Sequence, residues 1–304
     1  SIFISAFATA PLAAVPEFAF KDEIANIQTG VNALAKLTNG GVHFSLSSEN
    51  YSGTPLHKIE NVIQHVFSGK HPAGNVGVQI SHISPIMKGD TVWTVSLLLV
   101  AAIGKLFNTG KYDMTRKVAV TGPKAIDPSY VDALPGIAMK DLKEFYDNSA
   151  NDLRFISGDV LTGESVGENG FLGFFDNQVT FLHEGTEREV LGWAKPFRCK
   201  KFSSSHTYFS WLTPKKTYDM DTNFNGGPRA FVMSDVYSKV LPMDIYPVYL
   251  AKACLAGDID KMEKFGIYEV LPEDLALCEY VDPSKNDIQE MIQKGIDLML
   301  KEMA

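Results

Sequence analysis

The sequence predicts an α/β fold, then a small mixed β unit and a helical C-terminal part: an α/β plus α+β chain. Strand and helix patterns alternate over roughly the first hundred residues, which is typical of a parallel sheet built from βαβ units. Short strand patterns between Gly, Asn, Asp and Pro turns occupy residues 115–215, and from Phe231 onward the periodicity is helical. The length of 304 residues corresponds to about two or three domains.

The spacing of apolar residues predicts the first strands and helices. A short apolar run predicts a buried strand over Ile2–Ala6, which ends in the turn Phe7–Pro16. Phe18–Leu37 carries apolar residues every three or four positions, which predicts an amphipathic helix, and Asn39-Gly40-Gly41 is a typical helix stop. The same patterns then predict a strand over Val42–Leu46, a helix over His57–Phe67, a strand over Val76–Ile83 and a buried helix or strand over Val92–Gly104.

The middle and the end of the chain follow the same logic. Turn residues separate four short strands, one helical segment and a hairpin around Gly185, and glycines and prolines separate the final helices. The predicted elements are strands Arg116–Thr121, Leu153–Ser157, Gln178–Leu182 and Arg188–Trp193, and helical segments Met139–Tyr146, Tyr246–Ala256, Ile259–Phe265 and Asp287–Met299.

Charge is unevenly distributed. The formal net charge of −8 argues against a nucleic-acid partner. Residues 244–304 hold thirteen Asp/Glu and six Lys/Arg, a net −7, so the rest of the chain is close to neutral. This acidic end is interpreted as a solvated helical surface, with an acidic docking face as the alternative.

The cysteines and the apolar runs indicate the cellular environment of the protein. Cys199, Cys254 and Cys278 are too few and too scattered for a disulfide framework or a cysteine zinc site, and they fit inert thiols in a reducing compartment. The run Val92–Gly104 is well short of the roughly 20 residues that span a bilayer. No signal peptide is visible, and the strand-like start without an initiator Met leads us to expect a piece of a longer chain.

Nucleotide, metal and nucleophile motifs are missing from the sequence. The turn Phe7–Pro16 contains no glycine, whereas dinucleotide folds need glycines there for the backbone to approach the pyrophosphate. The nearest P-loop candidate, Gly104 to Gly110-Lys111-Tyr112, has one residue too many and Tyr in place of the Ser or Thr that holds magnesium. The seven histidines show no HxxxH or HExxH spacing, so we expect no metal site. Gly163 belongs to no nucleophile elbow, and Ser203-Ser204-Ser205-His206 is interpreted as a polar loop and not a catalytic pair, so we expect no catalytic residue.

Two C-terminal stretches match the spacing of an iron–sulfur motif without its ligands. The two-cluster ferredoxin frame is C-x2-C-x2-C-x3-C-P, and a cubane cluster needs about four thiolates. Only Cys278 is a cysteine among the eight positions, so we expect apolar side chains to turn inward there instead. The positions are Phe231, Ser234, Tyr237 and Leu241 before Pro242, and Pro272, Leu275, Cys278 and Asp282 before Pro283.

Eight strings of sequence, taken together, carry a family resemblance. The chain resembles the A subunit of the sodium-translocating NADH:quinone reductases, and the strings occur in that family's order over nearly the whole chain. They are Phe3–Ala13 (FISAFATAPLA), Lys70–Gly74 (KHPAG), Ala102–Phe107 (AIGKLF), Gly158–Gly163 (GDVLTG), Phe171–Phe174 (FLGF), Asn177–Val179 (NQV), Glu187–Trp193 (EREVLGW) and Asp274–Pro283 (DLALCEYVDP).

The resemblance implies three domains that follow a β-rich N-terminal domain of the family. They are a Rossmann-like domain over residues 1–112, a ubiquitin-like β-grasp domain with a hairpin extension over 113–225, and a helical ferredoxin-derived domain without clusters over 226–304. The same fold is implied for the flavin-bearing subunit of respiratory complex I and the C subunit of the Rnf complex.

The resemblance also implies a function. We expect a cofactor-free peripheral subunit of a membrane-bound, Na⁺-pumping NADH:ubiquinone oxidoreductase, on the cytoplasmic face of the bacterial inner membrane. Flavins and iron–sulfur centres would lie in partner subunits, an integral membrane subunit would be the main partner, and the isolated chain would be inactive. The alternatives are a flavin-dependent NADH dehydrogenase module and a soluble ligand-binding β-grasp module.

A quinone-contact site is expected at two proline-bearing turns. The loop Lys70–Gly74 precedes the predicted strand Val76–Ile83, and parallel sheets bind ligands beyond the carboxyl ends of their strands. The alternative is a loop that only sets strand entry. The candidate contacts are Thr9, Pro11, His71 and Gly74, with Thr9 and His71 as hydrogen-bond donors and Ala8, Ala10, Pro11 and Ala73 as an apolar slot for a quinone ring.

Overall fold

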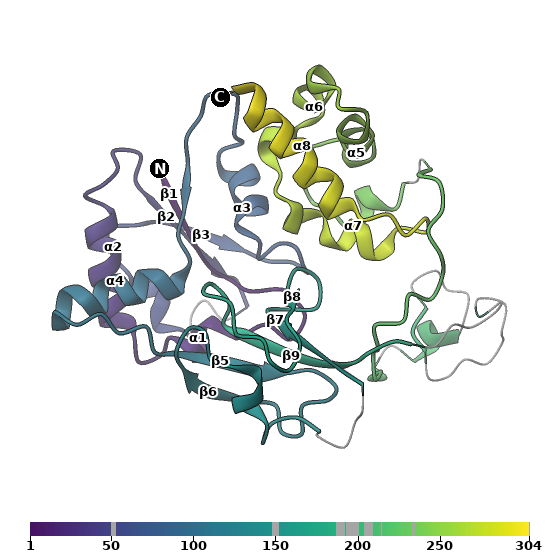
Figure 1. The fold of residues 1–304 in the computed structure, drawn as a ribbon. Helices are drawn as coiled ribbons and strands as arrows, with labels where there is room; N and C mark the ends of the chain where they lie inside the picture. Colours follow the sequence, from purple (N-terminus) through teal and green to yellow (C-terminus); the bar gives the residue numbers. More distant parts are fainter. Residues whose placement is uncertain are drawn as a thin grey trace.

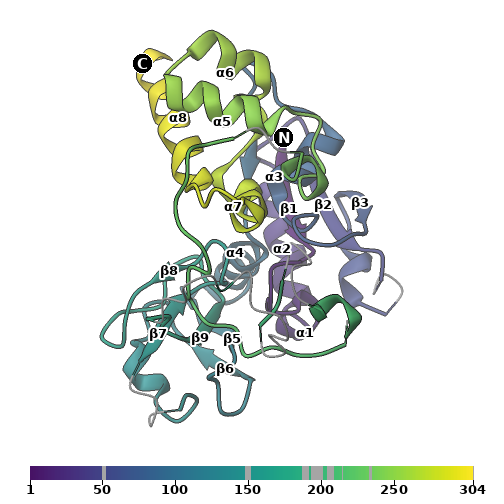
Figure 2. The same cartoon turned by 90° about the vertical axis from the view of Figure 1, so that its right-hand side faces the viewer.

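A computed structural model describes residues 1–49, 53–147, 152–186, 192, 201–203, 209–213, 215–232 and 235–303. Figures 1 and 2 show three packed regions: a parallel sheet with its helices, a mixed sheet, and a group of C-terminal helices. Each region has a hydrophobic cluster of its own. The expected combination of a parallel α/β part, a mixed β part and C-terminal helices is therefore confirmed.

The first region is a four-stranded sheet in the order β3-β2-β1-β4, with every pair parallel. Alternate residues of β1 and β2, such as Ile4 and Phe44, point into a core shared with α2 and α4, whereas α3 lies against the other face (Figure 1). The elements are β1 (Ile2–Ala6), α1 (Pro16–Ala19), α2 (Ile24–Leu34), β2 (Val42–Ser47), η1 (Pro55–Lys58), β3 (Ile63–Phe67), α3 (Val76–Ile83), β4 (Trp93–Thr94) and α4 (Leu97–Thr109).

Two glycines let α2 and α4 cross closely. A Cβ added at Gly30 would lie 2.1 Å from the carbonyl oxygen of Val100, and one at Gly104 would lie 1.7 Å from that of Asn26. Because both obstacles are backbone atoms, no change of rotamer relieves them. The crossing fixes α4 and therefore the start of this helix beside the candidate site.

The second region is a five-stranded mixed sheet in the order β6-β5-β9-β7-β8, in which only β5 and β9 are parallel. Its core contains Tyr146, Phe155 and Phe181, with ring centroids 5.0–5.5 Å apart. The elements are β5 (Arg116–Thr121), β6 (Ser129–Ala133), η2 (Met139–Leu142), β7 (Leu153–Ser157), β8 (Glu164–Ser165), β9 (Gln178–His183) and η4 (Phe209–Leu212).

The third region is helical. Its hydrophobic cluster contains residues of the two C-terminal stretches that match the iron–sulfur spacing without its ligands, the cysteine-poor frames. Tyr237, Leu241, Leu275 and Cys278 are 0–5% exposed, and Phe231 packs against them. The expected inward turn of these apolar side chains is confirmed; Ser234 lies outside the described residues. The elements are η5 (Tyr237–Lys239), α5 (Pro247–Ala256), α6 (Ile259–Phe265), η6 (Ile267–Glu269), η7 (Pro272–Leu275), α7 (Ala276–Val281) and α8 (Ile288–Met303).

Three element predictions in the first region are wrong. The segment His57–Phe67, predicted as a helix, is η1 followed by β3, and the predicted helix Phe18–Leu37 is broken into α1 and α2. β3 is an edge strand whose Ile63 and Val66 are 48% and 52% exposed, so its apolar spacing does not report burial. The break before α2 falls at the charged Lys21-Asp22-Glu23.

The third wrong assignment is Val76–Ile83, predicted as a strand and found as α3. Gln79 of α3 donates a hydrogen bond to Ser5 of β1, while Val78 belongs to the cluster of the C-terminal helices. A short helix that is buried on two sides shows no single apolar stripe, so the sequence pattern resembles strand alternation.

Several predictions are confirmed with their bounds or nearly so. Strands Ile2–Ala6, Arg116–Thr121 and Leu153–Ser157 and helix Ile259–Phe265 are found as predicted, and the run Val92–Gly104 contains both β4 and the start of α4. The predicted strand over residues 188–193 lies outside the described residues except for Gly192. In the described part of the chain, every helix is too short or too polar to cross a bilayer.

Candidate functional site

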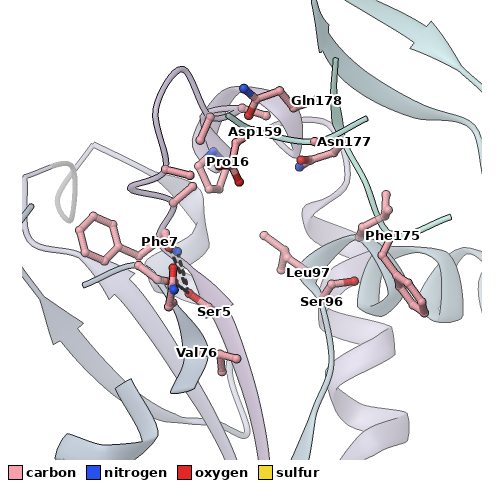
Figure 3. A pocket seen from close by; sticks show the side chains of 18 of the residues that line it. Ser5, Phe7, Pro16, Val76, Ser96, Leu97, Asp159, Phe175, Asn177 and Gln178 are labelled. Atoms are coloured by element: carbon pink, nitrogen blue, oxygen red, sulfur yellow. Dashed lines mark hydrogen bonds between the residues drawn. The ribbon is translucent and has the colours of Figure 1, made fainter. Parts of the chain in front are cut away.

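A cavity of about 650 Å³ lies where the three regions meet. Its walls include Ser5 of β1 and Phe7 just after that strand, Ser96 and Leu97 at the start of α4, Asp159 and Gln178 of the mixed-sheet region, and Glu273 of the helical region. Figure 3 shows Ser5 and Phe7 on one side of this space and Leu97 and Ser96 on the other, with the Phe7 ring directed away and with Asp159, Asn177 and Gln178 at the top of the view.

The position of the cavity follows from the strand order. In the order β3-β2-β1-β4, the chain leaves β1 toward β2 on one side and reaches β4 on the other. Loops after neighbouring parallel strands separate at such a reversal and leave a crevice beyond the carboxyl ends, where open α/β sheets bind ligands. The cavity occupies this place and has the size of a small-molecule site.

Thr9 and His71 meet in one wall, as expected from the two turns. The Thr9 hydroxyl accepts the Gly74 N–H at 2.9 Å and lies 3.2 Å from Nδ1 of His71. A hydroxyl has one proton, and the Gly74 N–H already occupies one of its lone pairs. When the Thr9 hydroxyl donates to Nδ1, the proton of the neutral imidazole lies on Nε2.

His71 Nε2 is buried and has no hydrogen-bond partner among the residues that the structure describes. Desolvation lowers the pKa of His71, against an opposing contribution from Asp159, so the ring is neutral at pH 7. His71 lines the cavity, and in the tautomer that accepts the Thr9 proton at Nδ1 its Nε2–H is an unused donor. Such a donor is suited to a carbonyl oxygen of a ligand.

Gly74 is needed for the approach of the two turns. A Cβ at this position would lie 2.6 Å from Thr9 Oγ1 and 2.8 Å from the carbonyl oxygen of Phe7. Behind the loop, the fully buried Gln79 donates from Nε2 to Ser5 Oγ at 3.0 Å and to the Gly74 carbonyl oxygen at 3.2 Å. The loop is thus fixed to β1 from both sides.

The described cavity wall carries negative but no positive side chains. None of the described residues that line it is Lys or Arg, whereas Asp159, Asp176 and Glu273 are all present. Desolvation, together with the carboxylates of Asp274 and Asp159, raises the pKa of Glu273. The wall therefore favours a neutral ligand over one that carries phosphate groups.

A buried hydrogen-bonded contact behind the cavity holds the helical region against α3. Asp274 is 1% exposed, and its Oδ1 accepts a hydrogen bond from Asn75 Nδ2 at 3.1 Å, just before α3. A Cβ at Gly77 would lie 2.3 Å from Asp274 Oδ2, so a side chain there would displace the Asp274 carboxylate. Burial raises the pKa of Asp274, while the Leu271 N–H and the Asn75 amide oppose this shift.

The structure brings together most, but not all, of the expected contact residues. Thr9, His71 and Gly74 line the cavity with Ala8 and Ala10, whereas Pro11 and Ala73 are not among the lining residues. Pro11 lies behind the wall, where its carbonyl oxygen accepts a hydrogen bond from Gln178 Nε2 at 3.2 Å. The loop Lys70–Gly74 connects β3 to α3 and does not precede a strand.

Sequence reasoning missed the far walls of the cavity. Asp159, Gln178 and Glu273 are more than 80 positions from His71, and no sequence motif joins them to it. One signal was available, because four of the eight strings that carry the resemblance supply lining residues. These strings are Phe3–Ala13, Lys70–Gly74, Gly158–Gly163 and Asn177–Val179.

The cysteine-poor frames do not fit an iron–sulfur cluster. Cys278 supplies one sulfur where about four thiolates are required, and burial raises its pKa to about 12, which opposes the ligating thiolate form. No group of three or more His, Cys, Asp or Glu side chains in the described ranges has a metal-binding arrangement.

Comparison with known proteins gives one consistent family. Residues 1–112 match the family described as the NqrA second alpha/beta domain. Three similar proteins, each named as the A subunit of an Na(+)-translocating NADH-quinone reductase, cover 99% of this chain. They come from Rhodopirellula baltica (36% identical, 66% of that protein covered), Vibrio atlanticus (34%, 67% covered) and Hahella chejuensis (36%, 67% covered).

The chain spans about two thirds of the length of these relatives. Among solved structures, the crystal structure of an NAD⁺-reducing [NiFe]-hydrogenase in the H2-reduced state aligns with a TM-score of 0.48 and 9% identity. That alignment covers 99% of this chain and 54% of the other.

Proposed function

The chain belongs to the family of the A subunit of the Na⁺-translocating NADH-quinone reductases, and on this premise we propose that it is a peripheral, cofactor-free subunit of such a complex. In this role it packs against an integral membrane subunit on the cytoplasmic side of the bacterial inner membrane. NADH oxidation, quinone reduction and sodium movement belong to the complex, with the flavins and iron–sulfur centres in partner subunits.

We also propose that the chain contacts quinone in the cavity, and one observation carries this proposal. His71 lines the cavity, its buried Nε2 has no partner among the described residues, and its Nδ1 lies within hydrogen-bond distance of the Thr9 hydroxyl. A quinone ring is flat, uncharged and apolar at its faces, with carbonyl oxygens that accept hydrogen bonds. A cavity whose described lining lacks Lys and Arg and offers one imidazole donor suits this chemistry. Thr9 and Gly74 set the donor, and Pro11 acts indirectly through Gln178.

The cofactor-free assignment rests on chemistry that the residues cannot supply. The turn after β1 has no glycine for a close approach to a pyrophosphate, and the described lining of the cavity has no cation to neutralise one. The proposed domain division is a Rossmann-like part over residues 1–112, a β-grasp part over 113–225 and a ferredoxin-derived part over 226–304. The separate hydrophobic clusters of the three regions support it.

The quinone-contact proposal is tested by titrating a short-chain ubiquinone into wild-type protein and into His71→Ala, with binding followed by calorimetry. Loss of one neutral hydrogen bond is expected to weaken binding by about 0.5–1.5 kcal/mol. The matched control is His82→Ala, because His82 lies outside the cavity lining and hydrogen-bonds the Pro242 carbonyl oxygen. Equal affinity in wild type and His71→Ala would remove His71 from the site.

Membership of a complex and the absence of cofactors have separate tests. Affinity purification of the tagged protein from membranes is expected to bring down an integral membrane subunit. The purified chain is expected to show no stoichiometric flavin absorbance near ~450 nm and no bound iron, because neither the β1 turn nor the cysteine-poor frames fit those groups. A flavin spectrum would instead favour the flavin-dependent NADH dehydrogenase module.

A further inference from the structure

An exposed aromatic pair lies at the edge of the cavity. Phe175 lines the cavity and is 68% exposed, and Phe174 beside it is 46% exposed. Their rings meet edge to face with centroids 5.1 Å apart. Figure 3 shows Phe175 on the opposite side of the cavity from Phe7. The pair is therefore an apolar surface that water reaches and that continues into the cavity wall.

A buried arginine holds this pair in place. Arg116, at the start of β5, is 5% exposed, and its guanidinium donates to the carbonyl oxygen of Phe174 at 2.7 Å and to that of Gly173 at 2.9 Å. On the other side of the same turn, the Ser157 hydroxyl accepts the Gly173 N–H at 2.8 Å and donates to the Asp176 carboxylate. Two side chains thus fix a turn that leaves apolar rings in water.

This arrangement needs an explanation beyond chain folding. Burying a Phe side chain stabilises a protein by about 1.5–3 kcal/mol relative to leaving it exposed, so an ordered turn with two exposed rings forgoes this gain. Contiguous exposed apolar side chains are typical of surfaces that bind a ligand or a partner. His71 and Phe175 line the same cavity.

We propose that Phe174 and Phe175 contact the apolar tail of a lipid-soluble quinone whose ring lies in the cavity, so that this chain recognises tail as well as ring. The inference rests on the proposed quinone contact at His71. Membrane quinones carry an apolar chain on the ring, and this chain must leave the cavity at its edge. Arg116 acts as a positioning residue, because it contacts the backbone of the turn and not the ligand.

The test compares two ligands of the same ring chemistry: the tailless dimethoxy-methyl-benzoquinone ring and ubiquinone with two isoprene units. Each is titrated into wild type, Phe175→Ala and Phe171→Ala below the solubility limit of the ligand. Phe171 is the matched control, because it is 60% exposed on the same region and does not line the cavity. Phe175 is largely solvent-exposed, so its substitution by Ala should leave the fold intact.

Wild type and Phe171→Ala are expected to bind the tailed ligand on the order of tenfold more tightly than the tailless ring, because the tail buries apolar carbon. Phe175→Ala is expected to lose most of this preference and to bind the tailless ring within about twofold of wild type. An undiminished preference in Phe175→Ala overturns the inference. Ring binding with no tail preference in wild type overturns it too and leaves the ring contact intact. If neither ligand binds wild type, both the inference and the proposed quinone contact fail.

Discussion

Replacing Gly104 by Ala tests the close crossing of α2 and α4 on which the cavity depends. The added Cβ would lie 1.7 Å from the carbonyl oxygen of Asn26 and 2.5 Å from its carbonyl carbon. Ordinary van der Waals contact begins near 3.4 Å, so one helix must move by about 1.7 Å (3.4 − 1.7) to accept the methyl group. Both contacts are backbone atoms inside helices, so local repacking of side chains cannot absorb this displacement.

The expected magnitude is a balance of two terms. Ala is favoured over Gly inside a helix by roughly 1 kcal/mol, so the substitution would stabilise an uncrowded helix. Overpacking a tight interior costs about 1–3 kcal/mol and occasionally more, and a clash between two rigid backbones belongs at or above the upper end. We expect a net loss of at least ~2 kcal/mol, which corresponds to a fall in Tm of about 3 °C or more for a chain of 304 residues.

Thermal unfolding followed by circular dichroism measures this loss. The matched control is Gly227→Ala, because a Cβ at Gly227 would meet nothing within 4 Å. We expect its stability to stay within about 0.5 kcal/mol of wild type. A Gly104→Ala protein that melts at or above the wild-type temperature would refute the reasoning, because it would show that the two helices separate without cost.

Three further predictions concern packing, reactivity and pH. Leu275→Ala should lower stability by about 2–5 kcal/mol in thermal unfolding, because Leu275 is fully buried, whereas the 61% exposed Leu300 should tolerate Ala. The Cys278 thiol, whose pKa burial raises to about 12, should resist alkylation at pH 8 in native protein and react after unfolding; rapid native labelling, mapped by mass spectrometry, would contradict this. Desolvation lowers the pKa values of His43 and His65 in the folded protein. Between these lowered pKa values and pH 6.5, the unfolded chain therefore binds more protons than the folded chain. Stability should therefore fall as pH drops from about 6.5 through the folded pKa values, and His65→Asn should flatten this fall in urea titrations at several pH values.

The sequence predicts elements best where one face of an element is buried and the other is wet. The helix Ile259–Phe265 meets this condition, with Met262 buried and Asp260, Lys261 and Lys264 exposed, and it is found with its predicted bounds. The pattern fails where burial does not follow one face. β3 lies at a sheet edge and exposes apolar residues, whereas α3 is buried between the sheet and the C-terminal helices. Tertiary packing, which a local pattern does not contain, decides both cases.

The candidate site is predictable in part, and for a simple reason. Thr9 and His71 follow two strands of one parallel sheet, and the carboxyl ends of such strands lie at the same edge. This argument holds although the element after the His71 loop is α3 and not the predicted strand. The opposite walls come from other regions, and residues such as Asp159 and Glu273 reach the cavity through packing that no local spacing encodes.

The position of α3 explains why the cavity and the packing of the three regions are linked. Val78 of α3 belongs to the cluster of the C-terminal helices, and Gln79, the next residue, holds both Ser5 and the loop that carries His71. Asp274 meets the start of the same helix through Asn75, and its neighbour Leu275 is buried in that cluster. Packing of the helical region therefore sets the position of His71. This role requires no redox centre in the helical region. A substitution that loosens the cluster, such as Leu275→Ala, is accordingly expected to weaken ligand binding at His71 as well as to lower stability.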